Sequence, residues 1–157
     1  MDALKAAARE IFDQCCADLR IAVNGLDAET LSRQPAPETS PLATLIRHSA
    51  SATRYQLTCA ATGRGDRQYY RTVERPGAFE GQPATADALI SVIDHLEEDG
   101  RRLIEAVPVD HLGERVVFEA ETEEGPARAW ALLHALEHLR EHVGHAQLTR
   151  QVLSVEP

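Results

Sequence analysis

The sequence predicts an all-α protein built as a four-helix bundle. In four separate stretches, apolar residues recur at every third or fourth position, which is the period of a helix that buries one face. Aliphatic residues are mostly alanine and leucine, whereas aromatic residues make up only 4% of the chain, and this balance favours helix over sheet. A length of 157 residues with 43% hydrophobic residues suits one core, so we expect residues 1–157 to form a single domain.

The first predicted helix spans residues 2–24. Its buried stripe is expected to consist of Leu4, Ala8, Ile11, Cys15, Leu19 and Ala22. The pair Asn24-Gly25 ends this helix, because glycine readily adopts the conformation that follows a helix end. Residues 26–39 contain two prolines and predict a connection with one helical turn around residues 28–33.

The second predicted helix begins at Ser40-Pro41 and runs to Thr62, ahead of Gly63. The serine hydroxyl can cap free amides, and proline in the first position has no amide to satisfy. One stripe of this helix collects Leu45, His48, Ala52, Tyr55 and Cys59, so His48 is expected to face inward. A buried imidazole needs a partner for each nitrogen, and a metal on one with a carbonyl or carboxylate on the other meets that need.

The remaining chain predicts two further helices and two connections. Residues 63–83 lack sustained periodicity, so we expect a long loop at the border of a site. The next helix, residues 85–106, leaves His95 off its stripe as a solvated histidine, and its buried residues are expected to be Leu89, Ile93, Leu96, Leu103 and Val107. The run from Arg115 to Thr122 predicts a short extended segment or hairpin, and residues 122–125 could alternatively form an acidic loop. Pro126 then opens the last helix, which extends to about Leu153 and completes a bundle with long connections.

This last helix carries four of the seven histidines. Relative to His138, the residues His134, His145 and His142 project at roughly −40°, −20° and +40°. The core face lies at roughly +100° to +160° and contains Leu132, Leu136, Leu139 and Val143. His138 and His142 are therefore expected nearest the core, about 5–6 Å apart at Cβ, which suits two ligands of one ion. His48 is the best candidate for a third ligand.

The alternative interpretation is that these histidines make only ordinary hydrogen bonds. That interpretation is favoured for a single histidine, whereas a pair four residues apart with a partner on another helix favours a metal. Three imidazoles suit zinc or nickel, with iron as a further option.

Charge and cysteine content exclude several classes of protein. A formal net charge of −9 argues against nucleic-acid binding, which needs a basic face. No apolar run reaches the roughly 18–20 residues that cross a bilayer, and residues 1–5 lack the layout of a signal peptide, so we expect no membrane partner and a cytoplasmic location. Cys15 and Cys16 diverge on one helix and Cys59 stands alone, which predicts no disulfide framework.

Two passages resemble the DinB/YfiT-like superfamily of four-helix-bundle proteins. They are Ser40-Pro-Leu-Ala-Thr-Leu-Ile-Arg-His48-Ser-Ala and the histidine-rich run from His134 to Arg150. The superfamily includes metal-dependent thiol S-transferases and mycothiol-dependent isomerases such as maleylpyruvate isomerase-like proteins, and the resemblance covers nearly the whole chain. Its metal triad carries over to His48, His138 and His142, while Gly144 and Arg150 match residues that commonly follow. Thr53 departs from the pattern, since some relatives have glutamate there.

The resemblance implies a divalent ion on three histidines, open positions for water or a small-molecule substrate, and often a homodimer. We therefore expect an enzyme that transfers a low-molecular-weight thiol, its cosubstrate, to an electrophile. Glu137 or Glu141 is a candidate for orienting a metal-binding histidine. Cys59 is expected to be dispensable, because it lies roughly 16 Å along the helix from His48.

Two other functions remain open at this point. The run His138-Leu-Arg-Glu141-His142 matches the inverted zinc-peptidase signature H-x-x-E-H, with Glu141 as general base of a hydrolase. Alternatively, the ion only cross-links two helices of a non-enzymatic stress-related or binding protein. A closed shell of four protein ligands would indicate that structural role, and an open position would indicate chemistry.

Overall fold

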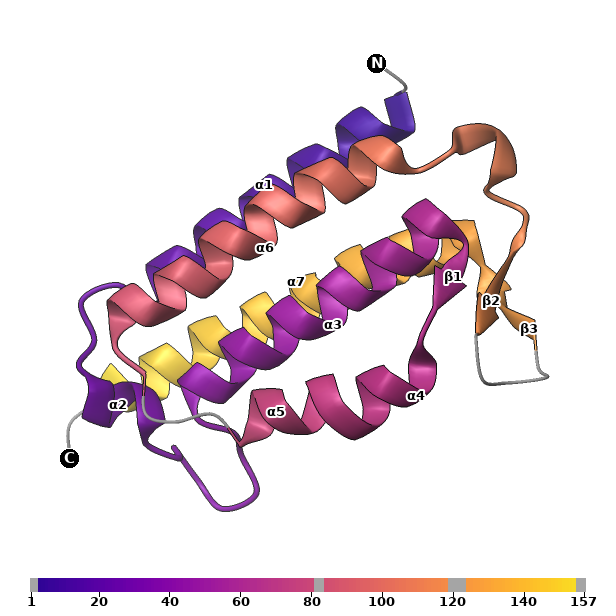
Figure 1. The fold of residues 1–157 in the computed structure, drawn as a ribbon. Helices are drawn as coiled ribbons and strands as arrows, with labels where there is room; N and C mark the ends of the chain where they lie inside the picture. The colour runs from indigo at the N-terminus through magenta and orange to yellow at the C-terminus, as the bar shows by residue number, and fades with distance from the viewer. Residues whose placement is uncertain (1–2, 81–83, 119–123, 155–157) are drawn as a thin grey trace.

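The predicted all-α bundle is confirmed by the structure, a computed structural model that describes residues 3–80, 84–118 and 124–154 (Figure 1). Its four long helices are α1 (Ala3–Val23), α3 (Leu42–Thr62), α6 (Ala86–Ala106) and α7 (Arg128–Ser154). The short helical segments are α2 (Ala28–Ser32), α4 (Arg67–Tyr69), the π-helical η1 (Tyr70–Glu74), α5 (Arg75–Phe79) and the single turn η2 (Val109–His111). The strands are β1 (Arg64–Gly65), β2 (Arg115–Phe118) and β3 (Glu124–Ala127).

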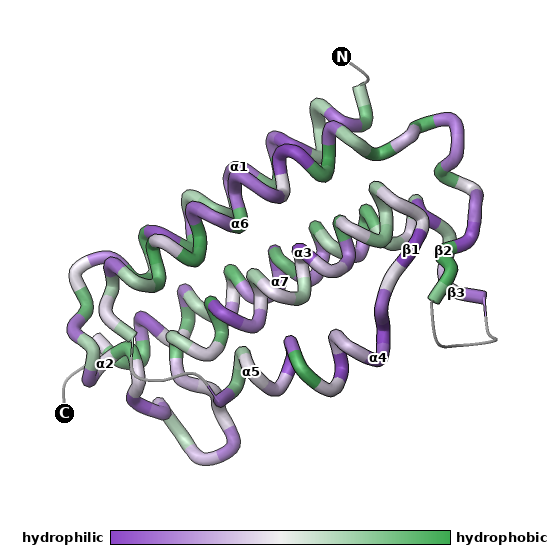
Figure 2. The backbone as a smooth tube through the Cα atoms, viewed as in Figure 1, coloured by the Kyte–Doolittle hydropathy of each residue, from purple (hydrophilic) through white to green (hydrophobic). Residues whose placement is uncertain are grey.

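The long helices share one hydrophobic core. Figure 1 shows α1 beside α6 and α3 beside α7, and α3 also packs against α6 while α1 packs against α7. Figure 2 shows hydrophobic residues recurring along all four helices between hydrophilic ones. Within the described ranges, no helix combines the length and the apolar character needed to cross a membrane.

The first helix ends as predicted, but it buries Phe12 in the core and not the predicted Ile11. It stops at Val23, and Gly25 adopts a φ of +76°. The assignment of Ile11 to the core is wrong, because this side chain is 47% exposed and its neighbour Phe12 is fully buried. Steps of three and four residues both fit a helical stripe, and the deciding factor is Gly100 on α6. A Cβ atom there would lie 2.1 Å from Cζ of Phe12, so glycine leaves room for the ring.

The predicted cap of the second long helix is also wrong. The helix begins at Leu42, and Pro41 occupies the N-cap position with extended backbone and no side-chain cap. Ser40 is therefore one residue too early to cap the helix. The other end agrees with the prediction, since the helix ends at Thr62 and Gly63 adopts a φ of +72°.

The predicted long loop at residues 63–83 is wrong for most of its length. Residues 67–79 form a helical arm, α4–η1–α5, which runs beside α3 (Figure 1). The side chain of Asp66 begins the arm by accepting a hydrogen bond of 2.8 Å from the amide of Tyr69. Only Ala78 of the arm is buried, so the arm has no apolar stripe from which its helical period could be recognised.

The predicted hairpin before the last helix is confirmed. β2 and β3 pair antiparallel, with Arg115 opposite Ala127, and the alternative acidic loop at 122–125 falls partly outside the described residues. β1 extends this sheet by pairing parallel with β2, which the sequence analysis did not predict. The predicted helix start at Pro126 is wrong, because this proline lies in β3 and α7 begins two residues later.

Two arginines tie the ends of α7 to the carboxyl ends of neighbouring helices. Arg128 is 7% exposed and donates hydrogen bonds to the carbonyl oxygens of Ala60 and Ala61 at the end of α3. Arg150 donates to three carbonyl oxygens at the end of α1, those of Ile21, Ala22 and Asn24. Carbonyl groups at a helix end have no partner within the helix and carry partial negative charge, so a guanidinium group stabilises both ends.

Candidate metal centre

The last helix places its histidines as the helical wheel predicts. Its core face is buried and contains Leu132, Leu136, Leu139 and Val143. His138 and His142 lie one turn apart at the edge of this face, and both are partly buried. Their ring centroids are 4.4 Å apart, and the two Nε2 atoms are 3.2 Å apart.

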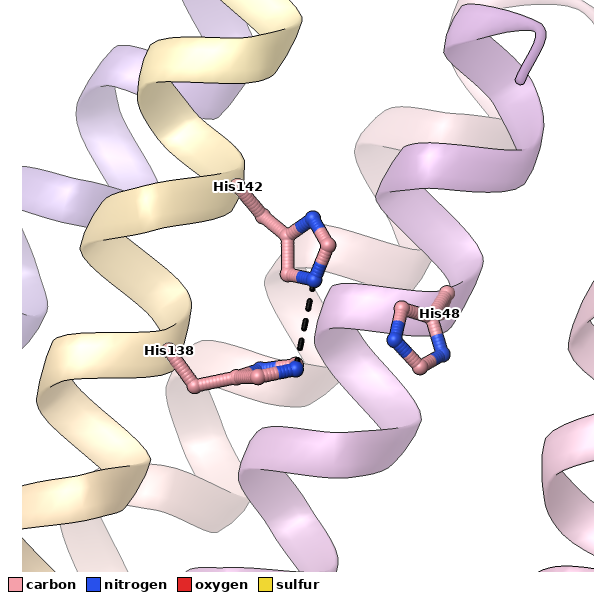
Figure 3. Close-up of side chains that lie close together, drawn as sticks. All are labelled: His48, His138 and His142. Atoms are coloured by element: carbon pink, nitrogen blue, oxygen red, sulfur yellow. Dashed lines mark hydrogen bonds between the residues drawn. The ribbon is translucent and has the colours of Figure 1, made fainter. Parts of the chain in front are cut away.

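The third predicted ligand comes from α3, which lies against α7. His48 is 9% exposed, and its ring centroid lies 5.4 Å from that of His138 and 5.0 Å from that of His142. Figure 3 shows the three rings pointing toward one another from the two helices. One ring nitrogen from each residue lies within 4.8 Å of the others. The structure therefore brings together all three residues that the sequence predicts as ligands.

Burial keeps these imidazoles neutral. It lowers the pKa of His48 to about 4, and the neighbouring His138 and Arg75 add to this effect. Burial and the adjacent histidines likewise lower the pKa of His142 to about 4, and burial is also the main cause of a lowered pKa at His138. At neutral pH each ring thus has an unprotonated nitrogen whose lone pair can bind a metal.

The hydrogen bonding of the three rings is incomplete. Among the described residues, the Nδ1 atoms of His48, His138 and His142 are buried without a partner. The Nε2 atoms of His138 and His142 face one another at 3.2 Å, so an ion would bind on that side of the rings and not at the Nδ1 atoms. Three neutral nitrogen donors facing one point are a suitable donor set for a divalent transition metal.

The two glutamates expected to orient a ligand do not contact the three histidines. Glu137 lies 3.3 Å from Nδ1 of His134 through its Oε2 atom, and Glu141 is exposed. Both glutamates are exposed on α7, and their charges partly oppose the lowering of the His138 pKa that burial causes.

The other histidines lie outside the triad. The His134 ring stacks on Trp130 with centroids 4.3 Å apart, and it lies 5.8 Å from His138. The exposed His145 lies 5.6 Å from His142. His95 is exposed as predicted, and Nδ1 of His111 contacts Oε1 of Glu114 at 2.5 Å.

Two residues near the centre were not predicted from the sequence as they are found. Phe79 was not predicted to lie there, and Thr53 stands where some relatives have glutamate. Phe79, at the end of the arm, places its ring 5.0 Å from His48, and no apolar periodicity in the arm marked it. Thr53 is fully buried, and its hydroxyl has no hydrogen-bond partner among the described residues. A capping Asp66 followed by arginines at every fourth position is the signal that would have indicated the arm.

Comparison with known proteins gives both a family and a fold. The family model for Mycothiol-S-transferase matches residues 7–154. A conserved protein from Enterococcus faecalis has a similar structure, with a TM-score of 0.76, 13% sequence identity and coverage of 98% of each chain. A DinB-like protein from Bacillus subtilis has a TM-score of 0.63 and 14% identity over 94% of this chain and 87% of its own. Among curated proteins, none matches significantly.

Proposed function

The chain belongs to the mycothiol-S-transferase family within the DinB/YfiT-like superfamily, and from this membership we propose a divalent-metal-dependent transfer of a low-molecular-weight thiol to an electrophile. The observation that carries the proposal is the convergence of His48, His138 and His142 on one point. The family match supports the thiol as cosubstrate.

The three histidines would hold the ion through neutral nitrogens. A divalent ion there supplies Lewis acidity, which lowers the pKa of a thiol and makes its thiolate available at neutral pH. Because the imidazoles add no negative charge, they leave the ion's full positive charge for this purpose. Zinc and nickel suit the donor set best, with iron as a further option.

In the proposed reaction, the thiol proton passes to solvent and a sulfur lone pair forms a bond to the electrophilic carbon. The leaving group departs with the electron pair of the bond that breaks. The protein's own cysteines are unsuited to this role, because burial raises the pKa of all three thiols, that of Cys59 to about 11 and that of Cys16 to about 12. All three remain protonated at neutral pH, so the nucleophile must be supplied from outside.

Hydrolysis is disfavoured by the position of Glu141. A general base must reach the water it activates, whereas this glutamate is exposed on α7 and makes no hydrogen bond to the centre among the described residues. The exposed position of Glu141 therefore gives the H-x-x-E-H match less support than the thiol-transfer proposal has.

The proposal is tested by screening the metal-loaded protein with mycothiol, bacillithiol, glutathione and cysteine against a generic electrophile. Conjugation should require the metal, survive Cys59→Ala, and disappear in His48→Ala but not in the matched variant His95→Ala. Cleavage of peptides or esters without thiol transfer would replace the proposal with hydrolysis. No activity in either assay would indicate a non-enzymatic bundle.

A further inference from the structure

A cavity of about 470 Å³ lies between the carboxyl half of α3, the arm, the hairpin and the start of α7. Flat aromatic side chains form part of its wall, namely Tyr70, Phe118 and Trp130, and two guanidinium groups, those of Arg67 and Arg71, line it as well. The ring of Tyr70 is held in place by stacking on Tyr55 with centroids 4.4 Å apart. The cavity therefore combines planar apolar surfaces and two positive charges with one carboxylate, that of Glu124.

This cavity lies close to the three-histidine centre. The ring of Trp130 stacks on His134, whose centroid is 5.8 Å from His138. Along α7, Trp130 and His138 are about 12 Å apart, and along α3, His48 and Tyr55 are about 10 Å apart, at about 1.5 Å per residue. The three histidines do not line the cavity, so a molecule that reaches them from its wall must span roughly 10 Å along the helices.

A row of arginines connects the cavity with the centre. Arg67, Arg71 and Arg75 recur at every fourth residue of the arm. The first two line the cavity, and the Cζ atom of the third lies 5.4 Å from the centroid of Phe79, the ring that contacts His48. No ion pair of Arg71 or Arg75 with a carboxylate is found within the described ranges, whereas Arg67 is already engaged and its guanidinium lies 5.0 Å from the ring centroid of Phe118. These positive charges stand out in a chain with a net charge of −9.

We propose that the cavity binds the electrophilic substrate and that this substrate carries a carboxylate on a planar, apolar body. A guanidinium group can form two parallel hydrogen bonds to a carboxylate, and aromatic rings provide flat contacts for an unsaturated body. Arg67 and Arg71 bind the carboxylate, while Phe118 and Trp130 contact the body and direct the reactive carbon toward the histidines. The inference rests on the proposed function for the identity of the reaction.

Binding is measured without any reaction, on metal-free full-length protein. Trp130 is the single tryptophan of the chain and lines the cavity, so its fluorescence reports occupancy. We expect saturable quenching by 4-methylbenzoate and little by 4-methylbenzamide, which has the same shape without the charge. Arg71→Ala and Arg67→Ala should each weaken benzoate binding by about tenfold or more, the loss expected for a charged hydrogen bond. The exposed Arg102→Ala on α6 is the matched control and should leave binding unchanged.

Transfer is measured with two electrophiles that share a reactive carbon, 4-(bromomethyl)benzoate and its methyl ester. The sulfur–carbon bond replaces the carbon–bromine bond, and bromide leaves with the electron pair. We expect Arg71→Ala to raise KM for the carboxylate by about tenfold with little change in kcat, and to leave the ester unaffected.

The two measurements separate the inference from the proposed function. Equal binding of benzoate and benzamide, or unchanged binding in Arg71→Ala, would overturn the carboxylate site whatever the transfer assay shows. If the active thiol displaces 4-methylbenzoate in the absence of an electrophile, the cavity is the binding site of the thiol. That result would overturn the assignment of the cavity to the electrophile. Selective benzoate binding without thiol transfer would support the anion site and reject the proposed reaction.

Discussion

The Nε2 atoms of His138 and His142 lie 3.2 Å apart, and the ring of His48 faces them from α3. Only one proton can lie between two such nitrogens, so a cation that accepts both lone pairs is the partner that suits the pair. We predict about one divalent ion per chain after reconstitution with zinc or nickel, measured by elemental analysis. Absence of stoichiometric binding across several divalent ions at neutral pH would refute the metal centre.

Individual histidines should contribute unequally to metal affinity. His48→Ala, His138→Ala and His142→Ala should each weaken binding by at least about 100-fold, since losing even an outer partner of a ligand costs about 10–100-fold. The exposed His95 supplies the matched control, and His95→Ala should leave the affinity nearly unchanged, as measured by competition with a chelating dye.

The flanking histidines provide a further check on the register of α7. His134→Ala and His145→Ala should have intermediate effects, because their rings lie 5.8 Å and 5.6 Å from the neighbouring ligand rings. His111→Ala, on the far hairpin side, should have no effect. Loss of binding in His145→Ala with retention in His138→Ala would mean that a different pair holds the ion.

Stability should decrease in alkaline solution because of the buried thiols. Burial raises the pKa of Cys16 to about 12 and that of Cys59 to about 11. Unfolded thiols ionise near pH 8.5, so between about pH 8.5 and 11 the unfolded chain releases protons that the folded chain retains. The free energy of unfolding should fall by up to about 1.4 kcal/mol per pH unit for each thiol.

Urea denaturation at about pH 8 and about pH 10 measures this decrease. The double variant Cys16→Ala, Cys59→Ala should lose less stability over the same interval. An equal loss in both proteins would contradict the retention of these protons in the folded state.

The close approach of α1 and α6 should make Gly100 sensitive to substitution. A Cβ atom at this position would lie 2.1 Å from Cζ of Phe12, so Gly100→Ala should destabilise the protein by about 1–3 kcal/mol through overpacking. Gly144 is the matched control, because it also lies within a long helix but has no described atom within 4 Å of its Cβ position apart from its chain neighbours and the backbone of its own helix. Gly144→Ala should stabilise by about 0.5–1 kcal/mol, and thermal denaturation that ranks the two variants the other way would contradict this account of the packing.

Elements with a long buried stripe could be predicted from the sequence. Leu132, Leu136, Leu139 and Val143 set the face of α7, and the position of the histidines followed from that face. The convergence of His48 with the other two rings also agreed with the prediction, although metal binding itself stays a prediction.

The remaining features depend on contacts between distant parts of the chain. Phe12 rather than Ile11 is buried because of Gly100, which comes much later in the sequence. The arm buries only Ala78, so no apolar stripe of its own marks it as helical, and it packs beside α3. Pro126 lies in a strand because β2 provides the partner, which no local signal could reveal.

The hydrogen bonds from Arg128 to the end of α3 determine which histidines of α7 lie opposite His48. The row His134, His138, His142 and His145 offers a neighbouring pair at nearly every turn of α7. If α7 slid along α3 by one turn, about 5.4 Å, His48 would face a different pair. Because Arg128 is anchored to the carbonyls of Ala60 and Ala61, the axial offset between the two helices is fixed at a point more than two turns away from the rings. The set of candidate metal ligands thus depends on a contact at the opposite end of α3, made by an arginine that would never contact the ion.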